Sequence, residues 1–219
     1  MKKGGLHTQR AALAVARYTA YLLKALIIGG AVYAFILRDY FMIFSAVVAI
    51  IGLMIPTFLH RQWRILLPLE FDLILTFFIA AHFILGELGA FYLKYWWFDL
   101  FLHDFSGFIT GLIGFIWAYM LLHTNKVSAR PWFIFVFTLS LSLAVGALWE
   151  IFEFTMDRFF GFNMQKSGLN DTMGDLIVCA FGALAAGLVG FLYLKYRKRG
   201  FVRRIMESWR ARRRIVEIR

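Results

Sequence analysis

The chain has few of the residues that cross-link a protein or divide it into domains. Its 219 residues include three prolines and one cysteine, Cys179, which lies inside an apolar run. A single cysteine cannot form an intrachain disulfide, so cysteine usage leaves the redox compartment open. No Ser/Gly-rich linker interrupts the sequence. These absences indicate one domain followed by a tail.

The sequence also lacks the short motifs of common hydrolases and nucleotide-binding enzymes. It contains no nucleophile elbow, no HExxH and no Gly-rich phosphate loop before a lysine. Ser106 follows His103 and Asp104 closely, but residues this near one another on a helix point in different directions. They do not predict a catalytic triad.

Apolar residues, in contrast, are abundant. The chain is 61% hydrophobic and 19% aromatic, with a mean hydropathy of +0.70, whereas soluble proteins are roughly 45–50% apolar. This composition predicts an all-α integral membrane protein. The net charge of +11 is then better explained by the positive-inside rule than by a nucleic-acid partner, and we expect none.

Six apolar segments approach or exceed the roughly 20 residues that a membrane-spanning helix needs. The first follows a basic stretch, but its apolar run is long and no small-x-small cleavage site follows it, so we expect a retained helix. The sequence therefore predicts a six-helix transmembrane bundle over residues 1–194, with spans at Thr19–Leu37, Phe41–Leu59, Phe71–Gly86, Phe98–Leu122, Trp132–Phe154 and Thr172–Leu194.

Basic residues are concentrated on one side of this bundle. Most of the 24 Lys and Arg residues precede the first span, lie in the second and fourth loops, or belong to the tail Lys195–Arg219. Both termini are therefore predicted to be cytoplasmic. Phe201, Ile205 and Trp209 recur at helical spacing in the tail, which predicts a basic amphipathic helix on the anionic inner leaflet. A solvated, partly disordered tail is the alternative.

Three pairs of polar residues have helical spacing, so each pair lies on one face of its helix. They open the fourth span, close the fifth and open the sixth, which the predicted topology brings to one depth at the extracytoplasmic face. Acids at membrane depth are costly and often functional. The pairs are Asp99 with His103, Glu150 with Glu153, and Asp171 with Asp175.

Carboxylates gathered in a medium of low dielectric need compensation from protons, from basic side chains such as Lys166, or from a divalent cation. Oxygen ligands suit Mg, Ca or Mn, and added histidine shifts the preference toward Zn or Fe. We therefore expect a divalent cation (Mg, Mn, Zn or Ca) bound by the three pairs and by His82 of the third span. In an enzyme, Glu150, Glu153 and Asp175 are the candidate catalytic residues.

A structural role is the alternative for several of these residues. Asp99, Asp104, Asp157 and Asp171 lie where helix caps are common. His82 fits a hydrogen-bonded core histidine equally well.

Four stretches, AHFILGELGAFY, WWFDLFLHDFSG, ALWEIFEF and NDTMGDLIVCAFGA, resemble the YjdF-type inner-membrane proteins and, more distantly, the VanZ-like membrane proteins linked to glycopeptide-antibiotic resistance. The resemblance covers residues 80–185. It implies a six-helix fold in a prokaryotic plasma (inner) membrane and no established reaction. In the proteins that the chain resembles, a polar residue usually stands at the position of Cys179. The matching positions are Asp99, His103, Trp149, Glu150, Glu153, Asp171, Thr172, Asp175, Gly182 and Ala183.

Three functions remain in competition. The first is a cation site at the extracytoplasmic face that acts on a lipid, lipid-linked or cell-envelope substrate. The second is a proton- or ion-coupled transporter, since intramembrane acids also serve as relays. A carrier should show polar residues continuing inward, but the inner halves of the last three spans offer little beyond Ser140, Ser142 and Cys179, so this function ranks below the first. The third is a non-enzymatic membrane partner protein. The sequence leaves open whether the protein is an enzyme.

Overall fold

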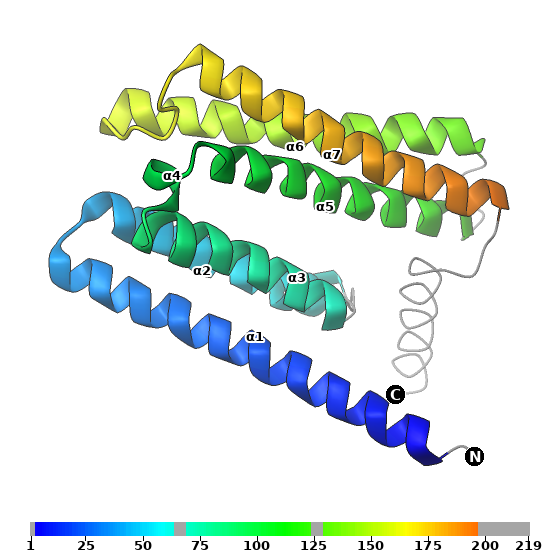
Figure 1. Cartoon of the computed structure of the whole chain (residues 1–219). Helices are drawn as coiled ribbons and strands as arrows, with labels where there is room; N and C mark the ends of the chain where they lie inside the picture. Colours follow the sequence, from blue (N-terminus) through cyan, green and yellow to red (C-terminus); the bar gives the residue numbers. More distant parts are fainter. Residues whose placement is uncertain (1–2, 64–68, 124–128, 197–219) are drawn as a thin grey trace. The chain divides into compact units, whose positions relative to one another are not determined.

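The computed structural model describes residues 3–63, 69–123 and 129–196, and every regular element within them is helical. The all-α class is therefore confirmed for these residues. The predicted amphipathic helix of the tail lies outside them beyond Tyr196. The chain divides into two compact units on either side of the Lys94–Tyr95 bond, and Figure 1 shows the helices of each.

The first unit contains α1 (Lys3–Leu37), α2 (Tyr40–Trp63), α3 (Leu69–Ala80), the π-helix η1 (Ala81–Leu88) and α4 (Phe91–Lys94). Its helices pack around an apolar core, and an ion pair joins Lys24 to Asp72 at 3.4 Å. The buried core residues are Ile27, Ala46, Ala49, Ile79, Ala80 and Phe83.

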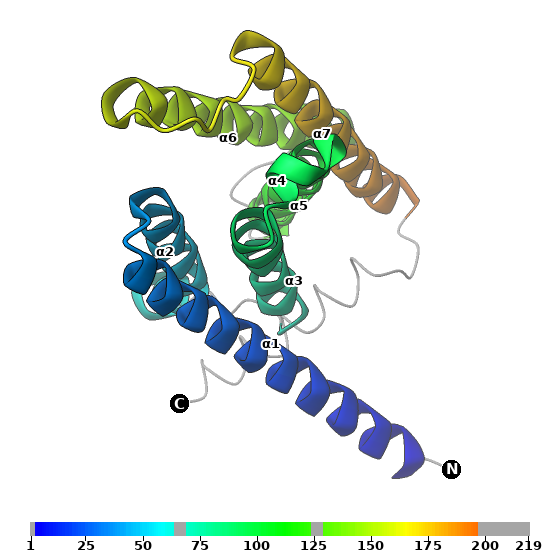
Figure 2. The ribbon, with the colours of Figure 1, turned by 60° about the vertical axis from the view of Figure 1, so that its left-hand side comes forward.

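The second unit is a bundle of three long helices, α5 (Trp96–His123), α6 (Pro131–Phe160) and α7 (Leu169–Tyr196). Each helix contacts the other two, and Figures 1 and 2 both show α6 and α7 joined by a short loop. Successive helices run in opposite directions. The start of α5, the end of α6 and the start of α7 therefore lie at the same end of the bundle.

Proline and glycine set the ends of α6. Pro131 occupies its first turn, where the missing N–H costs nothing. Gly161 ends the helix in the left-handed conformation, with φ of 69°, and its N–H donates to the Asp157 carbonyl. Gly168, with φ of 64°, closes the loop just before α7 begins. Both glycines hold backbone conformations that other residues rarely adopt.

Small residues let α5 and α7 approach closely. A Cβ atom on Gly107 would collide with the carbonyl oxygen of Cys179. One on Gly182 would collide with the carbonyl oxygen of Asp104 and lie 2.7 Å from the backbone nitrogen of Phe108. Backbone atoms cannot move aside as a flexible side chain can. The two helices therefore depend on glycine at these positions.

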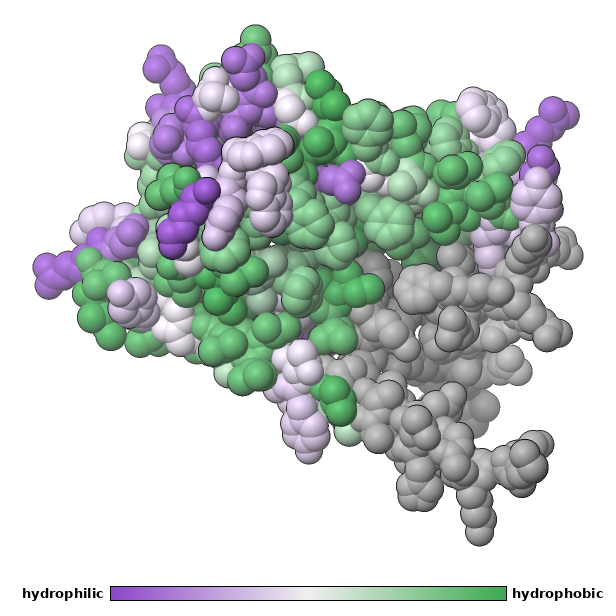
Figure 3. All heavy atoms as spheres, in the orientation of Figure 1, coloured by the Kyte–Doolittle hydropathy of each residue, from purple (hydrophilic) through white to green (hydrophobic). Residues whose placement is uncertain are grey.

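Five helical segments are long and apolar enough to cross a membrane: Arg17–Leu37, Tyr40–Phe58, Trp96–Tyr119, Pro131–Phe160 and Leu169–Tyr196. The third expected span, Phe71–Gly86, is divided instead between the 12-residue helix α3 and the π-helix η1. In Figure 3 apolar residues cover much of the second unit, and hydrophilic residues gather at the end where the α6–α7 loop lies. A multi-pass membrane protein is confirmed, while the six spans and the cytoplasmic termini stay predictions.

Candidate functional site

Members of all three polar pairs expected from the sequence lie together at one end of the second unit. Asp99 lies in the first turn of α5 and His103 one turn further on, 3.8 Å away between Oδ1 and Nε2. Glu150 comes from the last part of α6, and Asp175 from the second turn of α7. Side chains that are far apart in sequence therefore share one site.

His103 is the centre of this cluster. Its Nε2 atom lies 3.8 Å from Oδ1 of Asp99 and 3.9 Å from Oδ2 of Asp175. Its other ring nitrogen, Nδ1, lies 3.8 Å from Oε1 of Glu150. The imidazole thus faces carboxylates from all three helices. Two of these carboxylates lie near Nε2 and the third lies near Nδ1.

Two carboxylate oxygens of the cluster are buried without a hydrogen bond. Asp175 is 2% exposed and Glu150 is 4% exposed. Oδ2 of Asp175 and Oε1 of Glu150 have no hydrogen-bond partner within the described parts of the chain. Buried polar atoms are nearly always hydrogen-bonded. These two atoms, which both face His103, are therefore the ones best placed to receive a ligand or a proton donor.

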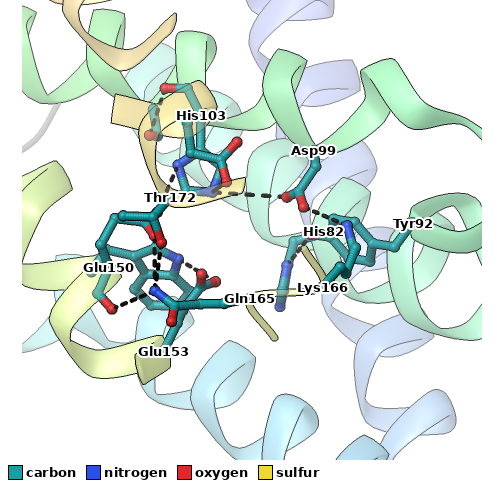
Figure 4. A network of polar contacts seen from close by, with 12 residues as sticks. His82, Tyr92, Asp99, His103, Glu150, Glu153, Gln165, Lys166 and Thr172 are labelled. Atoms are coloured by element: carbon teal, nitrogen blue, oxygen red, sulfur yellow. Dashed lines mark hydrogen bonds and ion pairs between the residues drawn. The ribbon is translucent and has the colours of Figure 1, made fainter. Parts of the chain in front are cut away.

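Hydrogen bonds to residues of α6 and α7 hold the α6–α7 loop beside the cluster. Both carboxylate oxygens of Asp157 accept backbone N–H groups, from Met164 at 2.7 Å and from Gln165 at 2.8 Å. The Gln165 side-chain amide donates to Thr172 at 2.7 Å and to the backbone and side chain of Glu150, both at 3.3 Å. In Figure 4 Gln165 lies between Glu150 and Thr172. No periodicity or motif in the sequence pointed to Gln165.

The same loop supplies a counter-charge. Nζ of Lys166 lies 2.5 Å from Oδ2 of Asp99 (Figure 4). The ammonium group therefore compensates part of the negative charge of the cluster, as one of the sequence-based alternatives anticipated. Asp171, also expected in the cluster, is half-buried in the first turn of α7.

Glu153 is buried one turn beyond Glu150 on α6. Its Oε1 atom accepts the indole N–H of Trp149 at 2.8 Å. Because the donor belongs to the same helix, Trp149 holds this carboxylate at a fixed place on the buried face of α6.

Asp99, His103 and Asp175 together form a group that could hold a divalent cation. One ligand atom from each lies within 4.8 Å of the others. Ligand atoms around a tetrahedral zinc ion are about 3.3 Å apart, given metal–ligand distances of about 2.0 Å, so these side chains need to close in by roughly 0.5–1.5 Å. Two carboxylates and an imidazole suit Zn, Mn or Fe.

His82 belongs to the first unit, where both of its ring nitrogens have partners. Its Nε2 atom lies 3.2 Å from the Ser45 hydroxyl, and its Nδ1 atom lies 2.5 Å from the Tyr92 hydroxyl. To ligate a metal, one of these nitrogens would have to give up its partner. The predicted role of His82 in the cation site stays a prediction.

Hydroxyl groups continue the polar face of α6 toward the middle of the bundle. Ser142 is fully buried, lies 2.8 Å from the Thr110 hydroxyl of α5 and donates to the Gly107 carbonyl at 2.7 Å. Thr138, one turn further, is also fully buried, and its hydroxyl has no partner among the residues described. The Ser106 hydroxyl donates to the His103 carbonyl at 2.9 Å, so it does not reach the ring as a triad would require.

Comparison with known proteins agrees with the membrane character of the fold. Residues 18–196 match the family model described as "Predicted membrane protein (DUF2238)". The chain belongs to this family. It is also 31% identical over 117 residues to an uncharacterized protein of Thermotoga maritima, and the aligned part covers 53% of this chain and 59% of that relative. The chain therefore spans less than two thirds of that protein.

No solved structure matches the chain. The family match covers most of the described helices of both units, from within α1 to the end of α7, and includes the whole cluster at the ends of α5, α6 and α7. The resemblance to YjdF-type and VanZ-like proteins goes beyond what these comparisons establish and stays a prediction.

Proposed function

We propose that this protein binds one divalent cation through Asp99, His103 and Asp175 and uses it to act on a lipid or cell-envelope substrate. The observation that carries the proposal is the buried Oδ2 atom of Asp175. It has no hydrogen bond among the described residues and faces Nε2 of His103 at 3.9 Å. Leaving a buried carboxylate oxygen in this state costs free energy that a bound cation would recover.

The setting favours a substrate that is held at the membrane surface. The cluster lies at one end of a bundle of membrane-length helices. By the positive-inside rule that end faces away from the cytoplasm, in a prokaryotic inner membrane. A lipid headgroup or a lipid-linked precursor can reach such a site from the bilayer.

The side chains around the proposed cation have separable tasks. A divalent cation supplies Lewis acidity and an activated water for hydrolysis. Asp99, His103 and Asp175 would ligate the cation, and Lys166 balances part of the charge of Asp99. Glu153, buried and held by the Trp149 indole N–H, is one candidate carboxylate for moving a proton.

Metal analysis of the full chain purified in detergent tests the proposal. The protein is dialysed against Mn²⁺ or Zn²⁺, washed and analysed for bound metal, beside the Asp175→Asn and His103→Gln variants. We expect about one ion per chain in the wild type and none in either variant. The matched control is Asp39→Asn, because Asp39 lies in the first unit and accepts the Met42 N–H. A wild type without stoichiometric metal contradicts the proposal.

A second candidate function is ion-coupled transport, which the buried hydroxyls of α5 and α6 favour. Ser142, Thr110 and Thr138 extend the polar face inward from the carboxylates, as a carrier requires. Proteoliposomes test it by uptake of Mn²⁺ driven by a proton gradient. Uptake that Ser142→Val abolishes would favour transport. Bound metal without any uptake would favour the first proposal.

A further inference from the structure

The two ring nitrogens of His103 face different carboxylates, and this separates the roles of those carboxylates. Nε2 faces Asp99 and Asp175, whereas Nδ1 faces Oε1 of Glu150 at 3.8 Å. A neutral imidazole carries a proton on one nitrogen and a lone pair on the other. A cation held between Asp99 and Asp175 needs the lone pair on Nε2. The proton must then lie on Nδ1, toward Glu150.

The α6–α7 loop holds the side chain of Glu150 in place. Its Oε2 atom and its backbone carbonyl accept the amide of Gln165, which also donates to Thr172. Oε1 has no hydrogen bond within the described residues, although Glu150 is 4% exposed. One carboxylate oxygen is therefore fixed by the loop, and the other is aimed at His103.

We infer that Glu150 is a positioning residue for the proposed cation site and not a ligand. When the side chains close in around the cation, Oε1 of Glu150, now 3.8 Å from Nδ1, would accept a hydrogen bond from the Nδ1–H group of His103 and so direct Nε2 toward the cation. Gln165 holds Glu150 in place for this contact. Metal-binding histidines usually donate their second ring N–H to a carboxylate or carbonyl, which fixes the tautomer and strengthens the ligand. This inference rests on the proposed cation site and revises the expectation that Glu150 ligates the metal itself.

The experiment uses the full chain in detergent with ring-¹⁵N-labelled histidine and Zn²⁺ as the probe. Zinc affinity is measured by competition with a chelator, and the ring ¹⁵N shifts of His103 report which nitrogen carries the proton. The variants are Glu150→Ala and Glu150→Gln. The matched control is Asp104→Ala, because Asp104 adjoins His103 in sequence but makes none of the contacts of the His103 ring described above.

We expect zinc on Nε2 and a proton on Nδ1 in the wild type. Glu150→Ala should keep one site but weaken zinc binding by about 10–100-fold, the usual effect of losing such a partner. The zinc affinity of Glu150→Gln should lie between those of the wild type and Glu150→Ala, because the amide oxygen of glutamine can still accept the Nδ1–H of His103. Asp104→Ala should change affinity less than about threefold. If Glu150→Ala does not fold, the zinc affinity of Glu150→Gln and the ring ¹⁵N shifts of wild-type His103 test the inference.

Two results would overturn the inference while leaving the cation site intact. One is zinc bound to Nδ1 in the wild type. The other is a Glu150 variant that binds zinc as tightly as Asp104→Ala does. A wild type that binds no zinc and no manganese instead contradicts the proposed function, so the two failures are distinguishable.

Discussion

Nζ of Lys166 lies 2.5 Å from Oδ2 of Asp99, although 67 residues separate them in the chain. The contact ties the α6–α7 loop to the first turn of α5 and brings a fixed positive charge beside the proposed cation site. Lys166 and a bound cation therefore act on the same carboxylate. Two positive charges a few ångströms apart repel, so the lysine should weaken cation binding.

Replacing Lys166 by methionine should raise the affinity for Mn²⁺ severalfold. The substitution keeps an apolar stem of similar length and removes the charge. Titration followed by electron paramagnetic resonance of free Mn²⁺ measures the effect. Lys195→Met is the control, because Lys195 lies in the last turn of α7, at the opposite end of the same unit. An unchanged or lower affinity in Lys166→Met would show that the proposed cation does not lie near Asp99.

The Asp175→Asn variant should be more stable than the wild type when both are free of metal. Asp175 is a buried carboxylate whose Oδ2 atom lacks a hydrogen bond within the described residues, and it shares its site with other acids. Removing its charge relieves repulsion and desolvation. A gain of about 1 kcal/mol corresponds to roughly 2–4 °C in melting temperature for a chain of this size. Thermal unfolding in detergent with a chelator measures it.

Added Zn²⁺ should reverse this order, since binding stabilises only the protein that has the site. Wild type with zinc should melt above Asp175→Asn with zinc. If the variant is less stable than the wild type without metal, Asp175 has a structural role that the carboxylate cluster does not explain.

Asp157→Ala should destabilise the metal-free protein, in contrast to Asp175→Asn. Both oxygens of Asp157 accept loop N–H groups, at 2.7 and 2.8 Å. Losing two such bonds should cost about 1–3 kcal/mol and increase proteolysis between Gly161 and Gly168. Limited proteolysis in detergent measures the loop, and Thr155→Ala, outside the loop on α6, is the control. Equal cleavage of both variants would mean that Asp157 does not hold the loop.

Gly182→Ala should destabilise the second unit by about 1–3 kcal/mol. The added Cβ would lie 2.7 Å from the backbone nitrogen of Phe108, which cannot move without shifting α5. Gly29→Ala is the control, because nothing lies within 4 Å of that position, and it should stabilise α1 slightly through helix propensity. Chemical unfolding followed by tryptophan fluorescence compares them. A tolerated Gly182→Ala would contradict the close packing of α5 and α7.

Helical spacing and span order predicted that Asp99, His103, Glu150 and Asp175 lie together at one end of the second unit. The i,i+4 pair Asp99 and His103 shares a helix face, and alternating spans bring Glu150 and Asp175 to the same end. Gln165 could not be found in this way, because a loop residue has no periodicity and its contacts depend on the left-handed turns at both ends of the loop.

No feature of the sequence indicated the break in the third predicted span. An apolar run specifies a helix but not its hydrogen-bond register, so nothing marked the change from α3 to the π-helix η1 at Ala81. His82 follows directly and reaches Ser45 and Tyr92 of the first unit. Its partners depend on packing between helices, which residue spacing within one helix does not encode.

The most direct test of the cation site is a crystal structure of the full chain soaked with Mn²⁺ or Zn²⁺. The account predicts an anomalous peak at about 2.0–2.3 Å from Asp99, Asp175 and Nε2 of His103, with Glu150 on the Nδ1 side of the ring. An anomalous map without a peak among these three side chains, at metal concentrations that saturate exposed carboxylates, would contradict it.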